Sequence, residues 1–290
     1  MSRTTVLKTY KLWVGGAFVR SESGRAYPVR NARGEFWANA PQASRKDLRD
    51  AVQAARSAQP SWAKRTAYNR GQILYRVAEM LETRRAALRD ELCAVLGVSP
   101  SDADAEIDAS IDRWVYYAGW SDKFGAVLSA VNPVAMPMHT FTVPEPVGVV
   151  GIACPPEAPL ASLCSLLAPA MVSGNTVVAL LPEDAPTVGL AFAEVLATAD
   201  LPAGVVNLLS GSPRELLPHL AAHVGVDALN LCGVPEPERA PLEQAAAETI
   251  TRLHHSPRLT PDEWRSDSAQ GLHWLEPYLE FKTVWHPLGW

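Results

Sequence analysis

The side chains that could serve as nucleophiles or metal ligands are few and scattered in this sequence. None of the four cysteines belongs to a Cys-x-x-Cys pair or has histidines at zinc-finger spacing. They are Cys93, Cys154, Cys164 and Cys232. His254 and His255 are adjacent but have no cluster of carboxylates near them in the sequence, so we interpret them as loop residues rather than metal ligands. The sequence therefore predicts neither a metal site nor a disulfide framework.

Cys232 and Glu157 are the candidates for a nucleophile and for an acid or base. Cys232 ends a predicted strand within an apolar run, where a buried and inert thiol is the more common situation. Cys154 and Cys164 lie in core-like segments and receive the same interpretation. Glu157 could work as an acid or base only if it is buried, because burial raises a carboxyl pKa toward neutrality. We expect it instead to be exposed in a disused cleft.

Charge is distributed unevenly along the 290 residues, whose formal net charge is −5. Residues 1–113 hold 19 Lys and Arg against 13 Asp and Glu, and residues 214–290 hold 6 against 11. Residues 124–213 contain no Lys or Arg, so they offer no cation to a phosphate group. The basic residues of the first third alternate with acidic ones, as on a solvated helix surface. We therefore expect no nucleic-acid partner.

Neither a membrane span nor a secretory signal is expected. Prolines and a glycine interrupt the longest uncharged stretch, 158–182, which therefore reads as buried core. The first ten residues carry Arg3 and Lys8 without the apolar core of a signal peptide. Together with the absence of a disulfide pattern, this predicts a cytoplasmic protein.

The elements before residue 125 are predicted to be a hairpin followed by helices. Residues 11–19 hold two short apolar runs around a Gly-Gly turn, which predicts a β-hairpin. Ser44 predicts the start of a helix that Pro60 ends. Apolar residues at helical spacing predict one long helix over 66–96 and a further helix around 107–118.

Strands and helices alternate from residue 146 to about 250. Strands are predicted over 147–153, 176–181, 205–209 and 226–231, and helices over 158–172, 185–199 and 214–223. This alternation predicts an α/β fold, a doubly wound parallel sheet of Rossmann-like type with helices on both faces, although no Gly-x-Gly-x-x-Gly occurs. An exposed strand is expected over 136–145. A connecting loop is expected over 254–267, and the end of the chain contains another short strand.

Six segments, spread from residue 12 to residue 285, carry a resemblance to a known family. They are Leu12-Trp-Val-Gly-Gly-Ala-Phe-Val, Glu145-Pro-Val-Gly-Val-Val-Gly, Leu167-Ala-Pro-Ala, Ser173-Gly-Asn-Thr-Val-Val, Leu201-Pro-Ala-Gly-Val-Val-Asn and Phe281-Lys-Thr-Val-Trp. In this order they resemble successive landmarks of the NAD(P)-dependent aldehyde dehydrogenases. The resemblance implies an NAD(P) cofactor and four parts. These are the hairpin and helices of a cofactor-type domain (1–124), an oligomerisation arm (125–145), a Rossmann-like core (146–253), and a linker with the C-terminal strand that completes the arm (254–290).

The resemblance also implies that a domain is missing. In the family a catalytic domain with the nucleophilic cysteine lies between the cofactor domain and the terminal strand, whereas here a linker of about twenty residues replaces it. The chain is most similar to the partial second copy at the C-terminal end of double-length aldehyde dehydrogenases.

Two of the family's motifs are altered at residues that would contact substrate or ribose. Glu157 stands where the family has the asparagine that donates to the oxyanion, and an ionised carboxylate repels a developing negative charge. Glu183 keeps its place in the ribose-holding motif, but Leu180 replaces the lysine. We therefore expect no catalytic residue, and Glu183 is retained as a cofactor-binding candidate.

The turn that meets the pyrophosphate is altered as well. It reads Cys232-Gly233-Val234-Pro235-Glu236, in which Val234 removes a hydroxyl and Pro235 removes a backbone N–H. Gly233 and Gly211 remain cofactor-binding candidates by resemblance. These changes predict that tight NAD(P) binding is absent.

Together these features predict a non-catalytic subunit that assembles with an active aldehyde dehydrogenase, with itself, or with both. The alternative is a stand-alone NAD(P)-binding oxidoreductase or a nucleotide sensor. The strands at 138–143 and 278–285 resemble those that pair within the family's arm and add to a neighbouring subunit's sheet, so we expect an oligomer.

Overall fold

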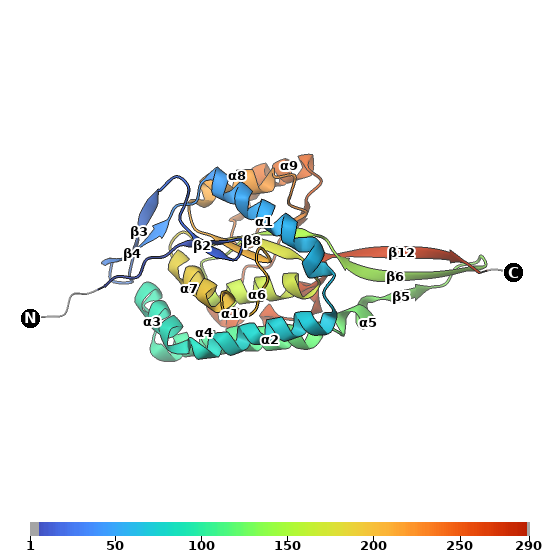
Figure 1. Ribbon diagram of the computed structural model, residues 1–290, viewed down its shortest axis with the longest axis horizontal. Coiled ribbons are helices and arrows are strands. Elements are labelled where there is room, and N and C mark those ends of the chain that lie inside the picture. The colour runs from blue at the N-terminus through green and yellow to red at the C-terminus, as the bar shows by residue number, and fades with distance from the viewer. Residues whose placement is uncertain (1–5, 289–290) are drawn as a thin grey trace, which may run out of the picture.

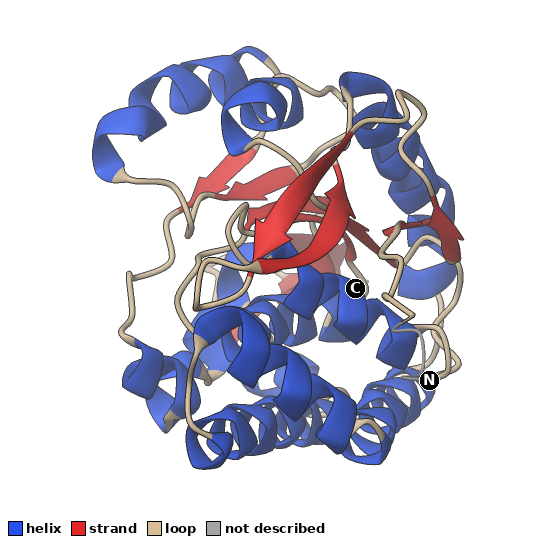
Figure 2. Cartoon of the chain, turned by 90° about the vertical axis from the view of Figure 1, so that its left-hand side faces the viewer, coloured by secondary structure: helices blue, strands red, loops and turns tan. Residues whose placement is uncertain are grey.

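The computed structural model describes residues 6–288 and has a central sheet between layers of helices, with a long β-arm extending from one side (Figure 1). The first described residues and the tip of the arm lie at opposite ends of the long axis. Seen along that axis, the strands of the sheet run through the middle of the body with helices on either side (Figure 2).

Seven strands form the central sheet in the order β11-β10-β7-β8-β9-β1-β2. The parallel strands are β7 (Val149–Ala153), β8 (Thr176–Leu180), β9 (Val206–Leu209), β10 (Ala228–Asn230) and β11 (Arg252–His254). The antiparallel edge is the hairpin of β1 (Leu12–Val14) and β2 (Ala17–Val19). From β7 the chain first moves outward to β8 and β9 and then returns to place β10 and β11 on the other side. This doubly wound, Rossmann-like order confirms the predicted fold class.

Helices cover both faces of the sheet. One face carries α1 (Arg45–Ala63), α8 (Pro213–Ala221) and α9 (Arg239–Glu248) (Figure 1). The other carries α6 (Pro159–Val172) and α7 (Pro186–Leu196), with α2 (Ala67–Thr83), α3 (Arg85–Leu96) and α4 (Pro100–Trp120) outside them. Every residue of α6 is buried because this helix lies between the sheet and α4. That position explains why its sequence is apolar around the whole helix.

Two predicted helix boundaries are wrong. Pro60 does not end α1, which continues to Ala63, because Trp62 is fully buried and its indole N–H donates to the carbonyl of Met171 at 3.0 Å. The packing of that last turn offsets the hydrogen bond that a proline removes. The predicted helix over 66–96 is two helices, broken at Arg84, since the apolar spacing continues across the break while the chain changes direction.

Several short elements were not predicted. They are the hairpin of β3 (Ala26–Arg30) and β4 (Phe36–Pro41), the short helix α5 (Phe124–Leu128), and strands β5 (Ala130–Asn132) and β11. The helix α9 also lies outside the predicted helices. These elements are short or only partly buried, so their sequences carry little periodicity.

The expected connecting loop after residue 254 is instead a folded segment, residues 255–278, here called the cap. It contains α10 (Pro261–Arg265) and the 3₁₀ turns η2 (Asp267–Ala269), η3 (Leu272–Trp274) and η4 (Glu276–Tyr278). Trp264 on α10 is buried beside α4 and α6, and Trp274 and Tyr278 are buried in the same core. The expectation was wrong because the polar residues between these aromatic side chains dominate the sequence pattern.

The arm is a three-stranded sheet in the order β12-β6-β5, with β6 over Met138–Pro146 and β12 over Leu279–Pro287. Strands β6 and β12 pair antiparallel from Leu279 opposite Pro146 to Pro287 opposite Met138, so the predicted pairing within the arm is confirmed. Beyond Leu279 every residue of β12 is exposed. Among the helices of residues 6–288, none combines the length and the apolar character needed to cross a membrane.

Candidate functional site

The candidate site lies where the order of the sheet reverses, between β7 and β10. In doubly wound sheets ligands bind in the crevice outside the carboxyl ends of the strands at this point. The loops that follow β7, β10 and β11 here enclose a pocket of about 400 Å³. Glu157, Cys232, Gly233, Arg239 and Arg258 are among its lining residues. The predicted candidates Glu157 and Gly233 are thus brought together, whereas Glu183 and Gly211 do not line this pocket.

Glu157 is not the exposed carboxylate that we expected. Its side chain is 25% exposed, and one carboxylate oxygen lies 3.2 Å from Nη2 of Arg258, a residue of the cap. The expectation was wrong because the cap supplies a cation that sequence reasoning placed in a loop. An ionised Glu157 has no proton to donate to an oxyanion.

The helix that begins beside Glu157 is also closed to a ligand. Ala158, just before α6, has a left-handed backbone with φ 43°. The buried carboxylate of Glu106 on α4 accepts hydrogen bonds from the N–H groups of Leu160 at 2.8 Å and Ala161 at 3.3 Å. Burial raises the pKa of Glu106, although these two bonds oppose the change. Sequence reasoning missed Glu106, whose only signal was a carboxylate on the apolar face of a predicted helix.

The thiols at this edge are buried, as predicted. Cys232 is 3% exposed, and burial, followed by the negative charge of Glu157, raises its pKa to about 12. Burial likewise raises the pKa of Cys154, the residue that follows the neighbouring strand β7. The thiolate is the nucleophilic form of cysteine, so neither side chain is prepared to attack a carbonyl at neutral pH.

Two backbone N–H groups in the turn after β10, those of Gly233 and Val234, are engaged within the protein. The N–H of Gly233 donates to Ala153 O at 2.8 Å, that of Val234 donates to Leu231 O at 3.0 Å, and Pro235 has none. A Cβ atom on Gly233 would lie 2.3 Å from the carbonyl oxygen of Cys154, so close packing alone requires this glycine. This turn therefore offers fewer backbone donors to a pyrophosphate than a helix start with unpaired N–H groups at these positions would.

The other cofactor candidates have separate surroundings. Leu180 is 4% exposed and belongs to the core, while Glu183 is exposed. A Cβ atom on Gly211 would lie 3.1 Å from the backbone nitrogen of Ala43, so this glycine also has a packing reason. The roles of Glu183, Gly211 and Gly233 in cofactor binding stay predictions.

Two arginines line the pocket at the switch point, and both come from outside residues 124–213, the stretch that contains no Lys or Arg. Arg239, at the start of α9, donates through Nε to Val234 O at 2.9 Å, and Arg258 pairs with Glu157. Sequence reasoning did not select either residue, because only the fold brings α9 and the cap to this edge.

His254 and His255 belong to no cluster of potential metal ligands within residues 6–288. His255 Nε2 lies 3.1 Å from a carboxylate oxygen of Glu243, so His255 does have one acidic neighbour. Burial, and then the neighbouring His255, lower the pKa of His254. Within residues 6–288 no group of three or more His, Cys, Asp or Glu side chains is placed to hold a metal ion.

A second hollow of about 420 Å³ opens between the first turns of α8 and α9. Its walls are mostly apolar, with Arg214 and Glu238 among them. The apolar lining consists of Pro213, Leu217, Pro218, Pro241 and Leu242. Both helices follow strands that end at the same edge of the sheet, so this apolar slot lies on the ligand-binding side of the fold.

Comparisons with known proteins all lead to one family. The aldehyde dehydrogenase family profile matches residues 18–255. Human retinal dehydrogenase 2 is 33% identical over 253 residues, which are 85% of this chain and 48% of that protein. The mitochondrial benzaldehyde dehydrogenase of Antirrhinum majus is 32% identical over 248 residues, 83% of this chain and 45% of its own. The chain thus spans about half the length of the curated relatives it matches.

Solved structures agree in fold. An aldehyde dehydrogenase from Bacillus cereus, solved as an NAD+ complex, superposes with a TM-score of 0.80 at 28% identity, over 86% of this chain and 50% of that one. Betaine aldehyde dehydrogenase from Staphylococcus aureus, a point mutant with NAD+, gives a TM-score of 0.80 at 25% identity, over 85% and 50%. The similarity therefore extends over the sheet and its helices rather than over isolated motifs.

Proposed function

The chain belongs to the aldehyde dehydrogenase family, and from this premise we propose that it is a non-catalytic member that assembles, through its arm, with an active aldehyde dehydrogenase, with a second copy of itself, or with both. The observation that carries the proposal is the path of the chain after the sheet. Strand β11 ends at His254 and β12 begins at Leu279, and the cap between them folds onto α4 and α6. The cap therefore occupies the stretch of sequence in which the family resemblance implies a catalytic domain.

The pocket at the switch point supports the same proposal. Glu157 is paired with Arg258, burial raises the pKa of Cys232, and Glu106 caps the helix that begins there. Oxidation of an aldehyde needs a thiolate and a donor to the oxyanion, and these side chains provide neither.

The exposed arm supports assembly. Phe281, Val284 and Trp285 are 46%, 40% and 55% exposed on β12, which forms an edge of the arm sheet. An uncovered edge strand with large apolar side chains favours pairing with another chain. All four cysteines are free, and we propose the cytoplasm as the location because its reducing conditions keep thiols in that state.

Catalysis is tested by incubating the purified chain with NAD+ or NADP+ and a panel of aliphatic and aromatic aldehydes, while absorbance at the wavelength of the reduced cofactor is followed. We expect no reduced cofactor above the rate of the blank. Turnover that disappears in Cys232→Ala would refute the non-catalytic assignment.

Assembly is tested by light scattering during size-exclusion chromatography. We expect the intact chain to form oligomers at micromolar concentration and the double variant Phe281→Ser/Trp285→Ser to shift toward monomer. Val224→Ser is the matched control, because Val224 is 84% exposed but lies outside the arm. A monomeric intact chain that also fails to associate with a co-expressed full-length aldehyde dehydrogenase would remove the assembly proposal.

A nucleotide-binding role is the second candidate, and the apolar slot between α8 and α9 favours it. The apolar walls of this slot suit a planar ring, and of its two charged residues Arg214 suits a nearby anionic group whereas Glu238 opposes one. Calorimetry with NAD+ and NADP+ decides between the candidates. A dissociation constant in the low micromolar range, about −8 kcal/mol, that weakens in Leu217→Asp would favour the nucleotide sensor, whereas the non-catalytic subunit predicts weak binding or none.

A further inference from the structure

A pocket of about 660 Å³ lies between the first turns of α1 and the end of α8. It shares no lining residue with the pocket at the switch point or with the slot between α8 and α9. Nothing in the proposed function uses it. Its chemistry therefore needs a separate explanation.

Basic side chains from two elements line this pocket. Arg45 and Arg49 are one turn apart on α1, and His219 and His223 come from the last turn of α8 and the residues that follow it. Arg45 has no hydrogen-bond or ion-pair partner in the described part of the chain. The Nδ1 atom of His223 accepts a hydrogen bond from the N–H of Gly225, which fixes this ring and leaves its Nε2 atom for another partner.

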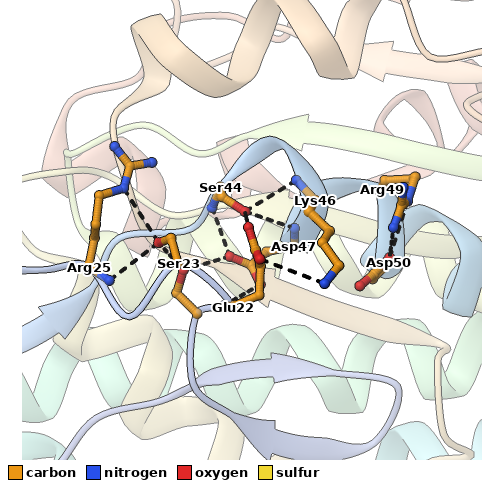
Figure 3. A network of polar contacts seen from close by, with 9 residues as sticks. Glu22, Ser23, Arg25, Ser44, Lys46, Asp47, Arg49 and Asp50 are labelled. Atoms are coloured by element: carbon orange, nitrogen blue, oxygen red, sulfur yellow. Dashed lines mark hydrogen bonds and ion pairs between the residues drawn. The ribbon is translucent and has the colours of Figure 1, made fainter.

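The acidic residues at the rim are already engaged with other groups. Glu215 is held by Arg25, with the closest contact at 2.8 Å. Glu22 accepts from the hydroxyl of Ser44 at 2.9 Å and lies 3.6 Å from the ammonium of Lys46, as Figure 3 shows. These carboxylates therefore do not neutralise Arg45.

The basic residues also stand where they oppose the stability of α1. Arg45 and Lys46 occupy its first turn, where the helix dipole favours negative charge. Arg45 and Arg49 form a like-charge pair at i and i+4, which is unfavourable by itself, although Arg49 also pairs with Asp50 at 3.1 Å (Figure 3). The helix end needs no ligand, because Ser44 and Asp47 form a capping box (Figure 3). An anion bound among the side chains would turn both unfavourable arrangements into favourable ones.

We propose that this pocket binds a small organic phosphate. Its phosphate group contacts Arg45, Arg49 and the two imidazoles, whose several N–H donors match the oxygens of a phosphate. Its carbon skeleton contacts the apolar part of the lining, which includes Leu48, Ala222 and Val224. The volume of the pocket leaves room for such a skeleton beyond the phosphate itself.

The proposal is tested by calorimetry with three probes at low ionic strength. Phenyl phosphate carries both the charge and an apolar body, inorganic phosphate carries only the charge, and benzyl alcohol carries only the body. We expect phenyl phosphate to bind more tightly than inorganic phosphate, and benzyl alcohol not to bind. The absence of phenyl phosphate binding at millimolar concentration would overturn the proposal.

Two variants separate a specific site from general attraction of anions. Arg45→Ala should weaken phenyl phosphate binding at least tenfold, whereas Lys64→Ala, which removes the same charge at the other end of α1, should leave it unchanged. Equal weakening by both variants would show non-specific attraction and reject the site. Without ligand, Arg45→Ala should melt at the same or a higher temperature than the wild type, because the arginine opposes the helix dipole.

The position of the ligand is tested by nuclear magnetic resonance. Phenyl phosphate should shift the imidazole signals of His219 and His223 and leave those of His139 and His286, which lie on the arm. Shifts confined to other histidines would place the ligand elsewhere and contradict the assignment.

Discussion

Replacing Arg113 with alanine should release the cap from the helices beneath it. Arg113 on α4 is 3% exposed, and its guanidinium donates to four oxygens. They are Ser165 Oγ at 3.0 Å on α6 and, in the cap, Gln270 Oε1 at 2.5 Å, Trp264 O at 3.3 Å and Ser266 O at 2.9 Å. One side chain thus joins three parts of the molecule.

The expected loss follows from these contacts. A hydrogen bond from a charged donor contributes about 1.5–3 kcal/mol, but four bonds from one group do not add. Removing the guanidinium also leaves buried carbonyl oxygens without donors, which costs about 1–3 kcal/mol for each acceptor that water cannot reach. We expect the free energy of unfolding to fall by about 3–5 kcal/mol, which is within the range for breaking a buried network.

Urea unfolding followed by tryptophan fluorescence measures this loss, because Trp264 and Trp274 are buried in the cap with ring centres 5.6 Å apart. Limited proteolysis should cut the Arg113→Ala variant first within residues 255–278. Arg113→Lys should lose less stability than Arg113→Ala, because lysine keeps the positive charge. It should still be less stable than the wild type, because lysine lacks the planar set of donors.

Arg89→Ala is the matched control for this experiment. Arg89 on α3 pairs with Asp104 on α4 at 3.4 Å, and its side chain is 38% exposed. Because the pair is exposed, removing it should change the free energy of unfolding by about 0.5 kcal/mol or less. If Arg113→Ala lowers the free energy of unfolding by less than about 1 kcal/mol and the cap stays resistant to protease, Arg113 does not hold the cap and the prediction is refuted.

The remaining predictions concern the edge of the sheet. Gly233→Ala should lower the free energy of unfolding by about 2 kcal/mol or more, measured in urea, because its Cβ would lie 2.3 Å from Cys154 O. Gly119→Ala, in the last turn of α4 with open space around it, should be neutral or stabilising by up to about 1 kcal/mol, so equal losses would contradict the packing argument. Burial raises the pKa of Glu106 in the folded state, so its contribution to stability is fully present below the unfolded pKa and is lost as the pH rises through the folded value. The difference in stability between Glu106→Gln and the wild type should therefore change with pH above about 4.5 in favour of the variant, and a pH-independent difference would contradict the raised pKa.

The parallel sheet could be predicted because the buried residues of its central strands and helices form nearly continuous apolar runs in the sequence. Strand β7 and helix α6 are buried at every position, and their apolar runs have lengths that suit only a strand and a helix. The break at Arg84 could not be predicted, because apolar residues keep helical spacing on both sides of it. The direction in which a chain turns depends on packing with distant helices, which local periodicity does not encode.

The candidate site could be predicted only in part, because some of its residues follow predicted strands and others are brought in by tertiary contacts. Glu157 and Gly233 follow strands that the sequence identifies, so the fold class already places them at one edge of the sheet. Glu106 and Arg258 reach this edge from α4 and the cap, more than 50 residues from Glu157 in either direction. Their contribution depends on tertiary contacts, and no motif marks either residue.

The cap connects the altered chemistry of the site with the altered course of the chain. The ion pair of Arg258 with Glu157 contributes little to stability, since the arginine side chain is 70% exposed and exposed pairs contribute about 0–1 kcal/mol. The buried tryptophans and the hydrogen bonds of Arg113 must therefore hold the cap in place. The ion pair then forms because the cap places Arg258 beside Glu157. The variant Glu157→Asn would leave the cap in place but remove that charge, so it should change the free energy of unfolding by less than about 1 kcal/mol, and we expect it to show no aldehyde oxidation. Under the proposed non-catalytic role, the protonated thiols, the capped helix and the cap itself would each have to change as well, so we expect no single substitution to produce aldehyde oxidation.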